Sequence, residues 1–397
     1  MVPFKIKKEF IMIQREMTKV MKKRAKEYPV LTVVGPRQSG KTTLVKSCFP
    51  NYNYANLEDP ETRDLAETDY KRFLSTYKTP LIIDEIQRVP KLASAIQVKV
   101  DENRNKTGQY ILTGSHQPVL KQTVTQSLAG RSAFLELFPL TFSELYKGRN
   151  KKEADVDDLI LTGTMPELTN GVIKPSIYYK NYVNSYIERD VRLISNIENT
   201  SSFNRFLVLL AGRIGQLVNL NTLSGEVGVS HTTLNSWLNI LEASFIVFRL
   251  EPYYANIGKR LIKTPKIYFT ETGLAAYLLG IKNSEQVSSH PLRGNLFENL
   301  VVGDVLRHEK NSDNDGGLFF FRTTNGLEVD LLRLCDDGFQ PIEIKSTMTY
   351  NPSLENSLSH FMDIFPKAVK PTLIYAGKNI PPGKSGIEYR NYLDFQF

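Results

Sequence analysis

The sequence predicts an α/β protein that begins with a parallel β-sheet covered by helices and continues into a helical lid, a winged-helix middle domain and a C-terminal α/β domain. Three observations predict this order. Short apolar runs alternate with helix-compatible stretches as far as about Leu137, a helix–turn–helix pattern lies between about Ser201 and Tyr254, and strands with alternating charges follow Gly294. A chain of 397 residues also exceeds the roughly 250–300 residues that one core supports, so we expect several domains.

The first predicted strand, Val30–Val34, leads directly into Gly35-Pro-Arg-Gln-Ser-Gly-Lys-Thr42, which fits the phosphate-loop (P-loop) pattern G-x-x-x-x-G-K-[ST]. A helix-compatible segment, Thr43 to Ser47, follows it. Glycines allow the backbone to turn tightly, and the loop amides and the positive end of the helix then face a bound phosphate. The pattern therefore predicts an ATP site formed by Gly35, Pro36, Arg37, Gln38, Ser39, Gly40, Lys41, Thr42 and Thr43.

Within this site, Lys41 is expected to reach the β- and γ-phosphates, and the Thr42 hydroxyl is expected to ligate Mg²⁺. A second apolar run, Leu81-Ile-Ile, ends in Asp84 and Glu85, as expected for a buried parallel strand. Asp84 is predicted to hold Mg²⁺ through water. Glu85 is predicted to orient or deprotonate the attacking water, which favours hydrolysis over simple binding.

A third apolar run, Gln109–Thr113, is followed by Ser115, which we predict to lie between the two earlier strand ends and to sense the γ-phosphate. Arg131 is a candidate for an arginine that stabilises charge in the transition state, either in cis or on a neighbouring subunit. For a lone arginine, a structural salt bridge is the alternative.

Composition restricts the class of protein. The formal net charge of +8 favours a polyanionic partner. Only two cysteines occur, Cys48 and Cys335, in different predicted domains, which argues against a disulfide framework or a cysteine-based zinc site and fits a cytoplasmic protein. Because no stretch approaches the roughly 18 apolar residues that a bilayer span needs, we expect no membrane segment.

The middle of the chain reads as helix, glycine-containing turn and helix over Leu220–Ser230 and His231–Leu241, with Ser230 as the N-cap of the second helix. Phe245–Phe248 is a candidate β wing. In a DNA reader, the second helix would present its polar side chains to a groove. Because this helix carries no Lys or Arg, a protein-contact role is the alternative.

A second group of charged residues lies near the C-terminus. A predicted helix over Gly294–Leu306 carries Glu298, and two predicted strands carry Asp330 and then Glu343 with Lys345. If the strands pair as a hairpin, their charged side chains converge on one face. Carboxylates there would suit Mg²⁺ or Mn²⁺, with Lys345 stabilising a hydroxide. The alternative is the solvated face of a sheet.

Together these motifs resemble the bacterial and archaeal AAA-type (AAA_14) ATPases that carry a C-terminal domain catalogued as DUF4143. The resemblance rests on segments spread over nearly the whole chain, namely Gly35–Thr43, Leu81–Pro90, Tyr110–Ser115, Leu128–Arg131, Leu137–Glu144, Phe297–Asn299, Glu328–Asp330 and Ile342–Lys345. It implies an AAA-type core, a winged-helix-like middle and a C-terminal domain similar to PD-(D/E)xK nucleases. The chain departs from the nuclease motif at Val329, where that motif has proline, which puts cleavage in doubt.

We therefore expect a P-loop core over 1–138, a helical lid over 139–198, a winged-helix-like domain over 199–290 and a nuclease-like domain over 291–397. The predicted function is an ATP hydrolase that binds duplex or branched DNA, with Mg²⁺ as cofactor and a homo-oligomer, possibly a hexamer, as its assembly. The alternative is a nucleotide-dependent signalling switch whose later domains bind a protein partner.

Overall fold

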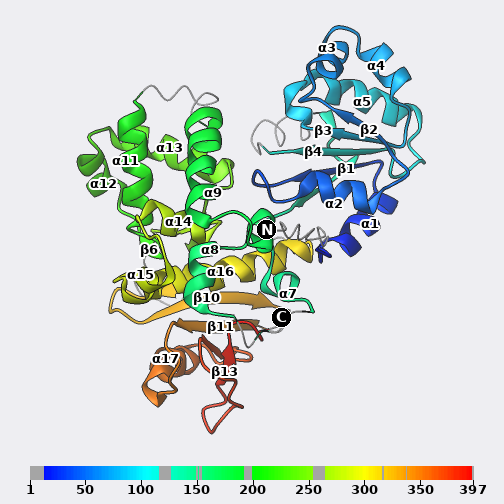
Figure 1. Ribbon diagram of the computed structural model, residues 1–397. Coiled ribbons are helices and arrows are strands. Elements are labelled where there is room, and N and C mark those ends of the chain that lie inside the picture. The colour runs from blue at the N-terminus through cyan, green and yellow to red at the C-terminus, as the bar shows by residue number, and fades with distance from the viewer. Residues whose placement is uncertain are drawn as a thin grey trace, which may run out of the picture.

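A computed structural model describes the fold in two lobes (Figure 1). The N-terminal lobe contains the strands β1 to β5, and the second lobe contains the helices and strands that follow β5. The structure describes residues 13–115, 127–148, 151, 154–191, 199–253, 264–314, 317–336 and 338–395.

The N-terminal lobe is built on a five-stranded sheet in the order β2-β3-β4-β1-β5, in which all neighbouring strands are parallel. Every residue of β1, β3 and β4 is buried, as expected for strands covered on both faces. The predicted parallel sheet is thereby confirmed. Its strands are β1 (Val30–Val34), β2 (Asn53–Asn56), β3 (Leu81–Asp84), β4 (Tyr110–Gly114) and β5 (Ser132–Glu136).

Helices cover both faces of this sheet. Leu31 and Val33 of β1 pack with α1 and α2, whereas Val30 and Val34 pack with the helices that precede and follow β3. This alternation along β1 is what buries the strand completely. The helices of the lobe are α1 (Thr18–Glu27), α2 (Lys41–Cys48), α3 (Pro60–Thr68), α4 (Tyr70–Thr76), the 3₁₀ turn η1 (Ile86–Arg88) and α5 (Lys91–Glu102).

The second lobe opens with helices. A capping box starts its first helix, since the Thr141 side chain accepts from the Glu144 amide and the Glu144 carboxylate accepts from the Thr141 amide. The predicted break lies where expected, between α8 and η3, with Gly163 as the C-cap of α8. These elements are α7 (Phe142–Leu145), α8 (Val156–Thr162), η3 (Pro166–Asn170), α9 (Pro175–Tyr182) and the π-helical segment η4 (Val183–Val191). The last part of the predicted lid, 192–198, lies outside the described residues.

The next elements follow the order helix, strand, helix, helix, strand, strand. Ser230 caps α13, accepting from the Thr233 amide at 3.1 Å, and so confirms the predicted N-cap. Apolar residues of the helix pair, such as Leu223 and Trp237, are buried. The elements are α11 (Thr200–Ala211), β6 (Gln216–Leu217), α12 (Leu220–Val227), α13 (His231–Ala243), β7 (Val247–Pro252) and β8 (Lys266–Phe269), followed by α14 (Thr272–Leu278) and α15 (Ser284–Ser289).

An eight-stranded sheet, ordered β13-β12-β11-β10-β9-β7-β8-β6, joins the two predicted C-terminal domains. The joint is the parallel pairing of β7 with β9, Glu251 opposite Phe319 and Pro252 opposite Phe320. One apolar core, which includes Leu140, Phe206 and Ile342, joins the helices of the second lobe to the large sheet, and a separate apolar cluster that includes Phe321 and Phe361 lies beside α17. The remaining elements are α16 (Arg293–Asn311), β9 (Leu318–Arg322), β10 (Glu328–Cys335), β11 (Gly338–Lys345), η5 (Pro352–Glu355), α17 (Asn356–Ile364), β12 (Thr372–Tyr375) and β13 (Glu388–Asn391).

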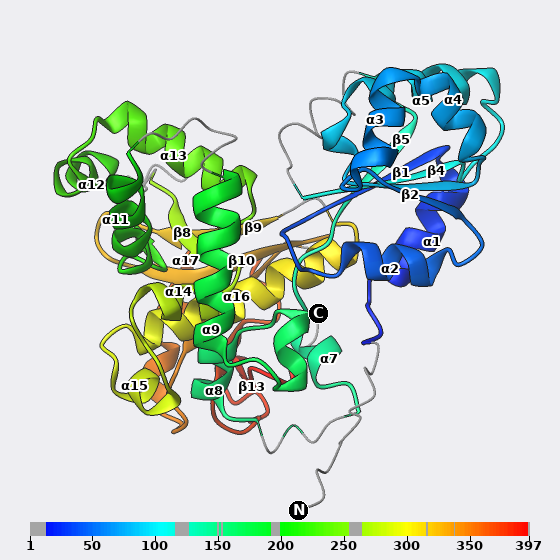
Figure 2. The ribbon, with the colours of Figure 1, turned by 45° about the horizontal axis from the view of Figure 1, so that its top comes forward.

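Helix α16 connects the two lobes. In both views it runs along the sheet of the second lobe and points toward the N-terminal lobe (Figures 1 and 2). Near its C-terminal end, Lys310 forms an ion pair with Glu136 of β5 at 2.8 Å. Among the described residues, none of the helices has both the length and the apolar character that a membrane crossing requires.

Candidate nucleotide site and C-terminal carboxylate cluster

The loop between β1 and α2 requires its glycines. Gly35 has φ +152°, and a Cβ there would lie 2.1 Å from the Leu137 carbonyl oxygen. Gly40, the N-cap of α2, is left-handed with φ 89°. Because a side chain fits neither position without strain, the two glycines let the loop fold tightly against β5 and start the helix. The predicted strand–loop–helix order is confirmed.

Lys41 lies inside this loop. Its ammonium donates to the carbonyl oxygens of Gly35 at 3.0 Å and Pro36 at 2.8 Å. Burial lowers the pKa of Lys41 to about 8, although the nearby carboxylates of Glu85 and Asp84 oppose the shift. The positive charge therefore stands where the loop amides and the start of α2 also favour an anion.

Asp84, at the end of β3, accepts hydrogen bonds from three hydroxyl groups. Its carboxylate accepts from Thr42 at 2.9 Å, from Tyr54 at 2.8 Å and, in a short hydrogen bond, from Thr113. The direct link between Thr42 and Asp84 joins the two predicted Mg²⁺ residues. Tyr54 and Thr113 were missed by sequence reasoning. Thr113 is the one polar side chain in the apolar run of β4, but only the sheet order brings Tyr54 of β2 here.

Glu85 follows β3 in a left-handed backbone conformation, with φ 56°, which is uncommon for a residue that carries a side chain. Its carboxylate accepts from Ser115 at 3.1 Å and from Gln87 in a short hydrogen bond. Ser115 follows β4, which lies between β1 and β3 in the sheet, as predicted. The strained turn thus places Glu85 beside the Ser115 hydroxyl at the carboxyl ends of the strands, where the P-loop also lies.

Arg131 lies at the amino-terminal ends of the strands, opposite the P-loop. It precedes β5, and its carbonyl accepts from the first residue of β1, Val30, whereas the P-loop follows the last residue of β1. Its guanidinium forms a bidentate ion pair with Asp101 at 2.8 and 2.9 Å. The structure therefore does not bring Arg131 to Lys41 and Glu85 of the same chain. This geometry agrees with the alternative interpretation of Arg131, a structural salt bridge.

Residues from outside the motif hold the loop in place. Arg15 donates to the Ser39 carbonyl at 2.8 Å and to the Phe138 carbonyl at 2.7 Å, and it forms an ion pair with Glu144 at 3.1 Å. The second lobe also contacts the loop, because the Arg37 guanidinium lies 5.4 Å from the centre of the Tyr186 ring. Sequence reasoning missed these supports because they join residues far apart in the chain.

The predicted C-terminal residues do come together. Strands β10 and β11 form the expected antiparallel hairpin. The Lys345 ammonium lies 2.6 Å from Glu343 and 3.4 Å from Asp330. Asp330 also accepts from the Ile344 amide at 2.9 Å. Because Asp330 is 7% and Glu343 4% exposed, these carboxylates do not form the solvated sheet face considered above.

Glu298 joins this group through a residue that sequence reasoning missed. Lys266 of β8 places its ammonium 2.9 Å from Glu298, 2.6 Å from Glu328 and 3.8 Å from Asp330. Tyr268, two residues along β8, donates to Glu298 at 2.5 Å. We call Glu298, Glu328, Asp330 and Glu343 the carboxylate cluster. A lysine in an otherwise apolar strand was the only available signal for Lys266.

The two sites differ in how well they suit a metal ion. Mg²⁺ is commonly held by one or two protein oxygens together with substrate phosphates, and Thr42 with Asp84 supplies such a pair beside the P-loop. In the carboxylate cluster, lysines already contact the carboxylates. Within the described ranges, no three or more Asp, Glu, His or Cys side chains are arranged to hold a metal ion.

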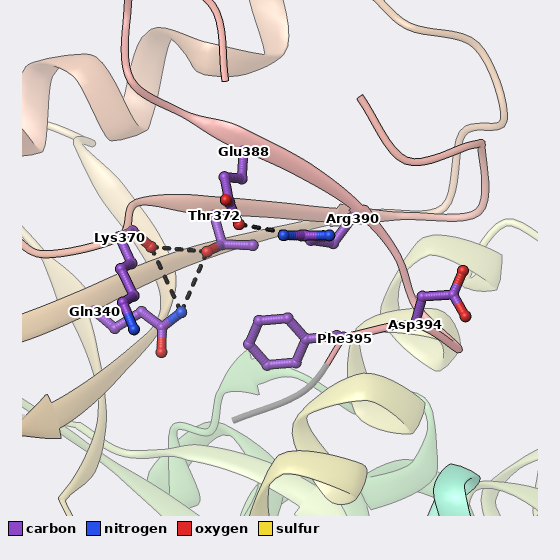
Figure 3. A pocket seen from close by; sticks show the side chains of 7 residues that line it. All are labelled: Gln340, Lys370, Thr372, Glu388, Arg390, Asp394 and Phe395. Atoms are coloured by element: carbon purple, nitrogen blue, oxygen red, sulfur yellow. Dashed lines mark hydrogen bonds and ion pairs between the residues drawn. The ribbon is translucent and has the colours of Figure 1, made fainter. Parts of the chain in front are cut away.

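A separate polar pocket of about 270 Å³ opens at the β13 end of the large sheet. Figure 3 shows Gln340, Thr372 and Arg390 on neighbouring strands, with the Phe395 ring facing them. Gln340 donates to Thr372 at 3.2 Å, and Arg390 to Glu388 at 3.1 Å. None of the predicted site residues lines this pocket.

Three family descriptions match consecutive parts of the chain. An "AAA domain" matches residues 27–146. A "Domain of unknown function (DUF8612)" matches residues 153–285, and a "Domain of unknown function (DUF4143)" matches residues 293–392.

Similar proteins are known from several organisms. The uncharacterized proteins Mb2031c of Mycobacterium bovis and Rv2008c of Mycobacterium tuberculosis are each 30% identical to this chain over 357 residues, covering 88% of this chain and 77% of theirs. An uncharacterized protein of Haemophilus influenzae is 24% identical over 85% of this chain and 88% of its own length.

Two solved structures show a distant likeness to this chain. The Walker-type ATPase PABY2304 of Pyrococcus abyssi has a TM-score of 0.42 and 12% identity, covering 67% of this chain and 96% of that protein. AMPPCP-bound DnaA from Aquifex aeolicus has a TM-score of 0.30 and 12% identity, covering 57% and 85%.

Proposed function

The chain belongs to the family of AAA-type ATPases that carry a C-terminal DUF4143 domain, and we propose that it hydrolyses ATP at the P-loop and couples hydrolysis to DNA binding. One observation supports hydrolysis above all others. Two hydrogen-bonded pairs, Thr42 with Asp84 and Ser115 with Glu85, lie at the carboxyl ends of the parallel strands. Lys41 lies at the same end of the sheet. Ligands of such sheets bind at the carboxyl ends of the strands.

Each residue has a proposed role in hydrolysis. Lys41 binds the β- and γ-phosphates, and Thr42 with Asp84 would hold Mg²⁺. A bound Mg²⁺ would neutralise charge on the phosphate oxygens. Glu85 orients or deprotonates the attacking water, and the Ser115 hydroxyl holds the Glu85 carboxylate and senses the γ-phosphate. The remaining P-loop residues, except Pro36, which has no backbone N–H, would donate their amides to the phosphates.

The Glu85→Gln variant tests hydrolysis. We expect turnover to fall by about 10²–10⁴-fold while ATP affinity stays within a few-fold of wild type, because the amide keeps the shape but cannot accept a proton. Turnover would be followed by phosphate release and affinity by fluorescent-nucleotide titration. Glu102→Gln, an exposed carboxylate on α5, is the matched control. Full turnover in Glu85→Gln would exclude the proposed role.

DNA binding is supported by the order and surface of the middle elements. From α11 to β8 the elements follow the order helix, strand, helix, helix, strand, strand, which supports the proposal of a winged helix. On α13, the side chains of Thr232, Asn235 and Ser236 are exposed, as a groove-reading helix requires. The net charge of +8 favours a phosphate backbone. Residues 254–263, which link β7 to β8, lie outside the described residues, and their sequence includes Lys259, Arg260 and Lys263.

The exposed face of α13 provides a direct test. The double variant Asn235→Glu with Ser236→Glu adds two negative charges, so we expect DNA affinity to fall at least about tenfold and DNA-stimulated ATP turnover to be lost. The control, Asn51→Glu with Asn105→Glu, adds the same charge to exposed residues of the N-terminal lobe. Affinity would be measured by fluorescence anisotropy on single-stranded, duplex and branched DNA at two salt concentrations. ATP turnover that no DNA stimulates would contradict the proposal.

A second candidate, a nucleotide-dependent switch that binds a protein, is favoured by one observation. Helix α13 carries no Lys or Arg, although phosphate contacts usually involve these residues. Specific capture of one protein after nuclease treatment, which the Asn235→Glu and Ser236→Glu change abolishes, would favour this candidate over DNA binding.

Two finer predictions concern assembly and cleavage. Assembly into a ring in which Arg131 acts on a neighbouring subunit stays a prediction, and it requires the ion pair of Arg131 with Asp101 to open. Magnesium-dependent cleavage of DNA requires a metal ion at Asp330 and Glu343. The Lys266 ammonium lies 3.8 Å from Asp330 and the Lys345 ammonium 2.6 Å from Glu343, so both carboxylates are already paired with cations.

A further inference from the structure

We propose that the ammonium of Lys266 is the resident cation of the carboxylate cluster and that it excludes divalent metal ions from this site until it is displaced. The inference goes beyond ATP hydrolysis and DNA binding and does not depend on either. It concerns how the C-terminal part of this particular chain is kept from binding a metal ion.

The position of Lys266 supports the proposal. Its side chain is 3% exposed and lies over the Phe320 ring, with the ammonium 5.6 Å from the ring centre. The ammonium then ends among carboxylates from two elements, Glu298 of α16 and both Glu328 and Asp330 of β10. A buried charge is tolerated only when it is paired, and three surrounding carboxylates satisfy this condition.

Several of the oxygen atoms that a metal ion would need are already engaged. The same oxygen of Glu298 accepts from Lys266 and from Tyr268. One oxygen of Asp330 accepts from the Ile344 amide and from Lys345, and the other faces Lys266. Since Mg²⁺ requires about six oxygens at roughly 2.1 Å, an ion bound to Glu298 and Asp330 would compete directly with the ammonium.

Other cations balance the remaining negative charge. The Lys345 ammonium lies 2.6 Å from Glu343, and the Arg322 guanidinium lies 3.0 Å from Glu328. One Glu343 oxygen is also buried without a hydrogen-bond partner among the described residues. The cluster thus contains a buried carboxylate oxygen that a metal ion can use once Lys266 leaves.

The test uses the full chain without nucleotide and Mn²⁺ as the probe, with free Mn²⁺ measured by electron paramagnetic resonance. We expect Lys266→Gln to bind one Mn²⁺ at the carboxylate cluster, with an affinity at least about tenfold higher than that of wild type for this site. Adding Asp330→Asn should abolish the new site. Lys310→Gln, which removes another ion-paired lysine of the second lobe, should bind Mn²⁺ like wild type.

Two results would overturn the proposal. The first is a wild-type Mn²⁺ site that Asp330→Asn abolishes and that is as tight as in Lys266→Gln. The second is a folded Lys266→Gln variant that gains no site. If Lys266→Gln does not fold in the absence of metal, the proposal requires that added Mn²⁺ restore folding, seen as a cooperative thermal unfolding transition. Failure of Mn²⁺ to do so counts against it, and the ATP-turnover tests above are unaffected in either case.

Discussion

At the scale of single residues, the nucleotide site depends on one buried charge. Lys41 is held by two carbonyl oxygens of its own loop, and burial lowers its pKa to about 8. A phosphate that contacts the ammonium favours the charged form and must raise this pKa. Nucleotide binding and protonation of Lys41 are therefore linked above neutral pH.

This linkage predicts proton uptake. Near pH 9, where the free Lys41 is mostly neutral, ATP binding should take up most of one proton, and near pH 7 it should take up little. Isothermal titration calorimetry in two buffers of different ionisation enthalpy measures the uptake. The Lys41→Arg variant, whose guanidinium does not titrate in this range, is the control, since any uptake by other groups should remain in it. Equal uptake at both pH values would contradict the assignment.

At the scale of elements, α12 shows how two glycines three residues apart serve different needs. Gly225 lies within the helix, and a Cβ there would meet nothing within 4 Å. Gly228 ends the helix as its C-cap with φ 80°, in the left-handed region. The first glycine only weakens the helix, whereas the second makes its termination possible.

The two positions should respond to the same substitution with opposite signs. Gly225→Ala should stabilise the chain by about 0.5–1 kcal/mol because alanine favours a helix. Gly228→Ala should destabilise it by about 1 kcal/mol because alanine is strained at positive φ. Urea unfolding of the two variants side by side measures both changes, and each variant is the control for the other. Destabilisation by both would show that α12 tolerates no Cβ on that face.

At the scale of the whole molecule, α16 joins the carboxylate cluster to the N-terminal lobe. Glu298 lies in its first half, and His308 in its second half contacts Glu16 at 3.2 Å and Asp304 at 3.5 Å. Asp304 in turn accepts from the Phe142 amide at 2.7 Å. Although burial lowers the pKa of His308, its hydrogen bonds to Asp304 and Glu16 raise it to about 10.

The sign of the pH dependence follows from this shift. A histidine whose pKa is raised on folding stabilises the fold fully below its unfolded pKa, near 6.5, and this contribution is lost as the pH rises toward 10. Burial raises the pKa of Glu16, but hydrogen bonds with His308 and Ser143 lower it to about 2, so its contribution is present above about pH 4.5 and lost as the pH falls toward 2.

We therefore expect His308→Gln to lower the free energy of unfolding by roughly 1–3 kcal/mol near pH 6.5 and by progressively less toward pH 10. Urea unfolding across this range measures the difference. The exposed His360 provides the control variant, His360→Gln, which should follow wild type. A constant difference at every pH would mean that packing, and not the charge of His308, accounts for the loss.

Several features were predictable because their signals are local. The P-loop, the buried strand that ends in Asp84, the cap at Ser230 and the hairpin of β10 and β11 each depend on neighbouring residues and on side-chain alternation. The predicted domains 199–290 and 291–397 instead share one sheet, because the pairing of β7 with β9 joins residues as far apart in the chain as Glu251 and Phe319.

The sequence by itself determined the chemistry available to the nucleotide site, because glycine, lysine, threonine and carboxylates at fixed spacing suit only a few ligands. The tertiary structure alone decided which distant groups complete each site. It placed Arg15 against the P-loop and Lys266 among the C-terminal carboxylates. It placed Arg131 with Asp101 at the amino-terminal ends of the strands, away from the P-loop. Such contacts depend on strand order and lobe packing, and spacing along the chain does not encode them.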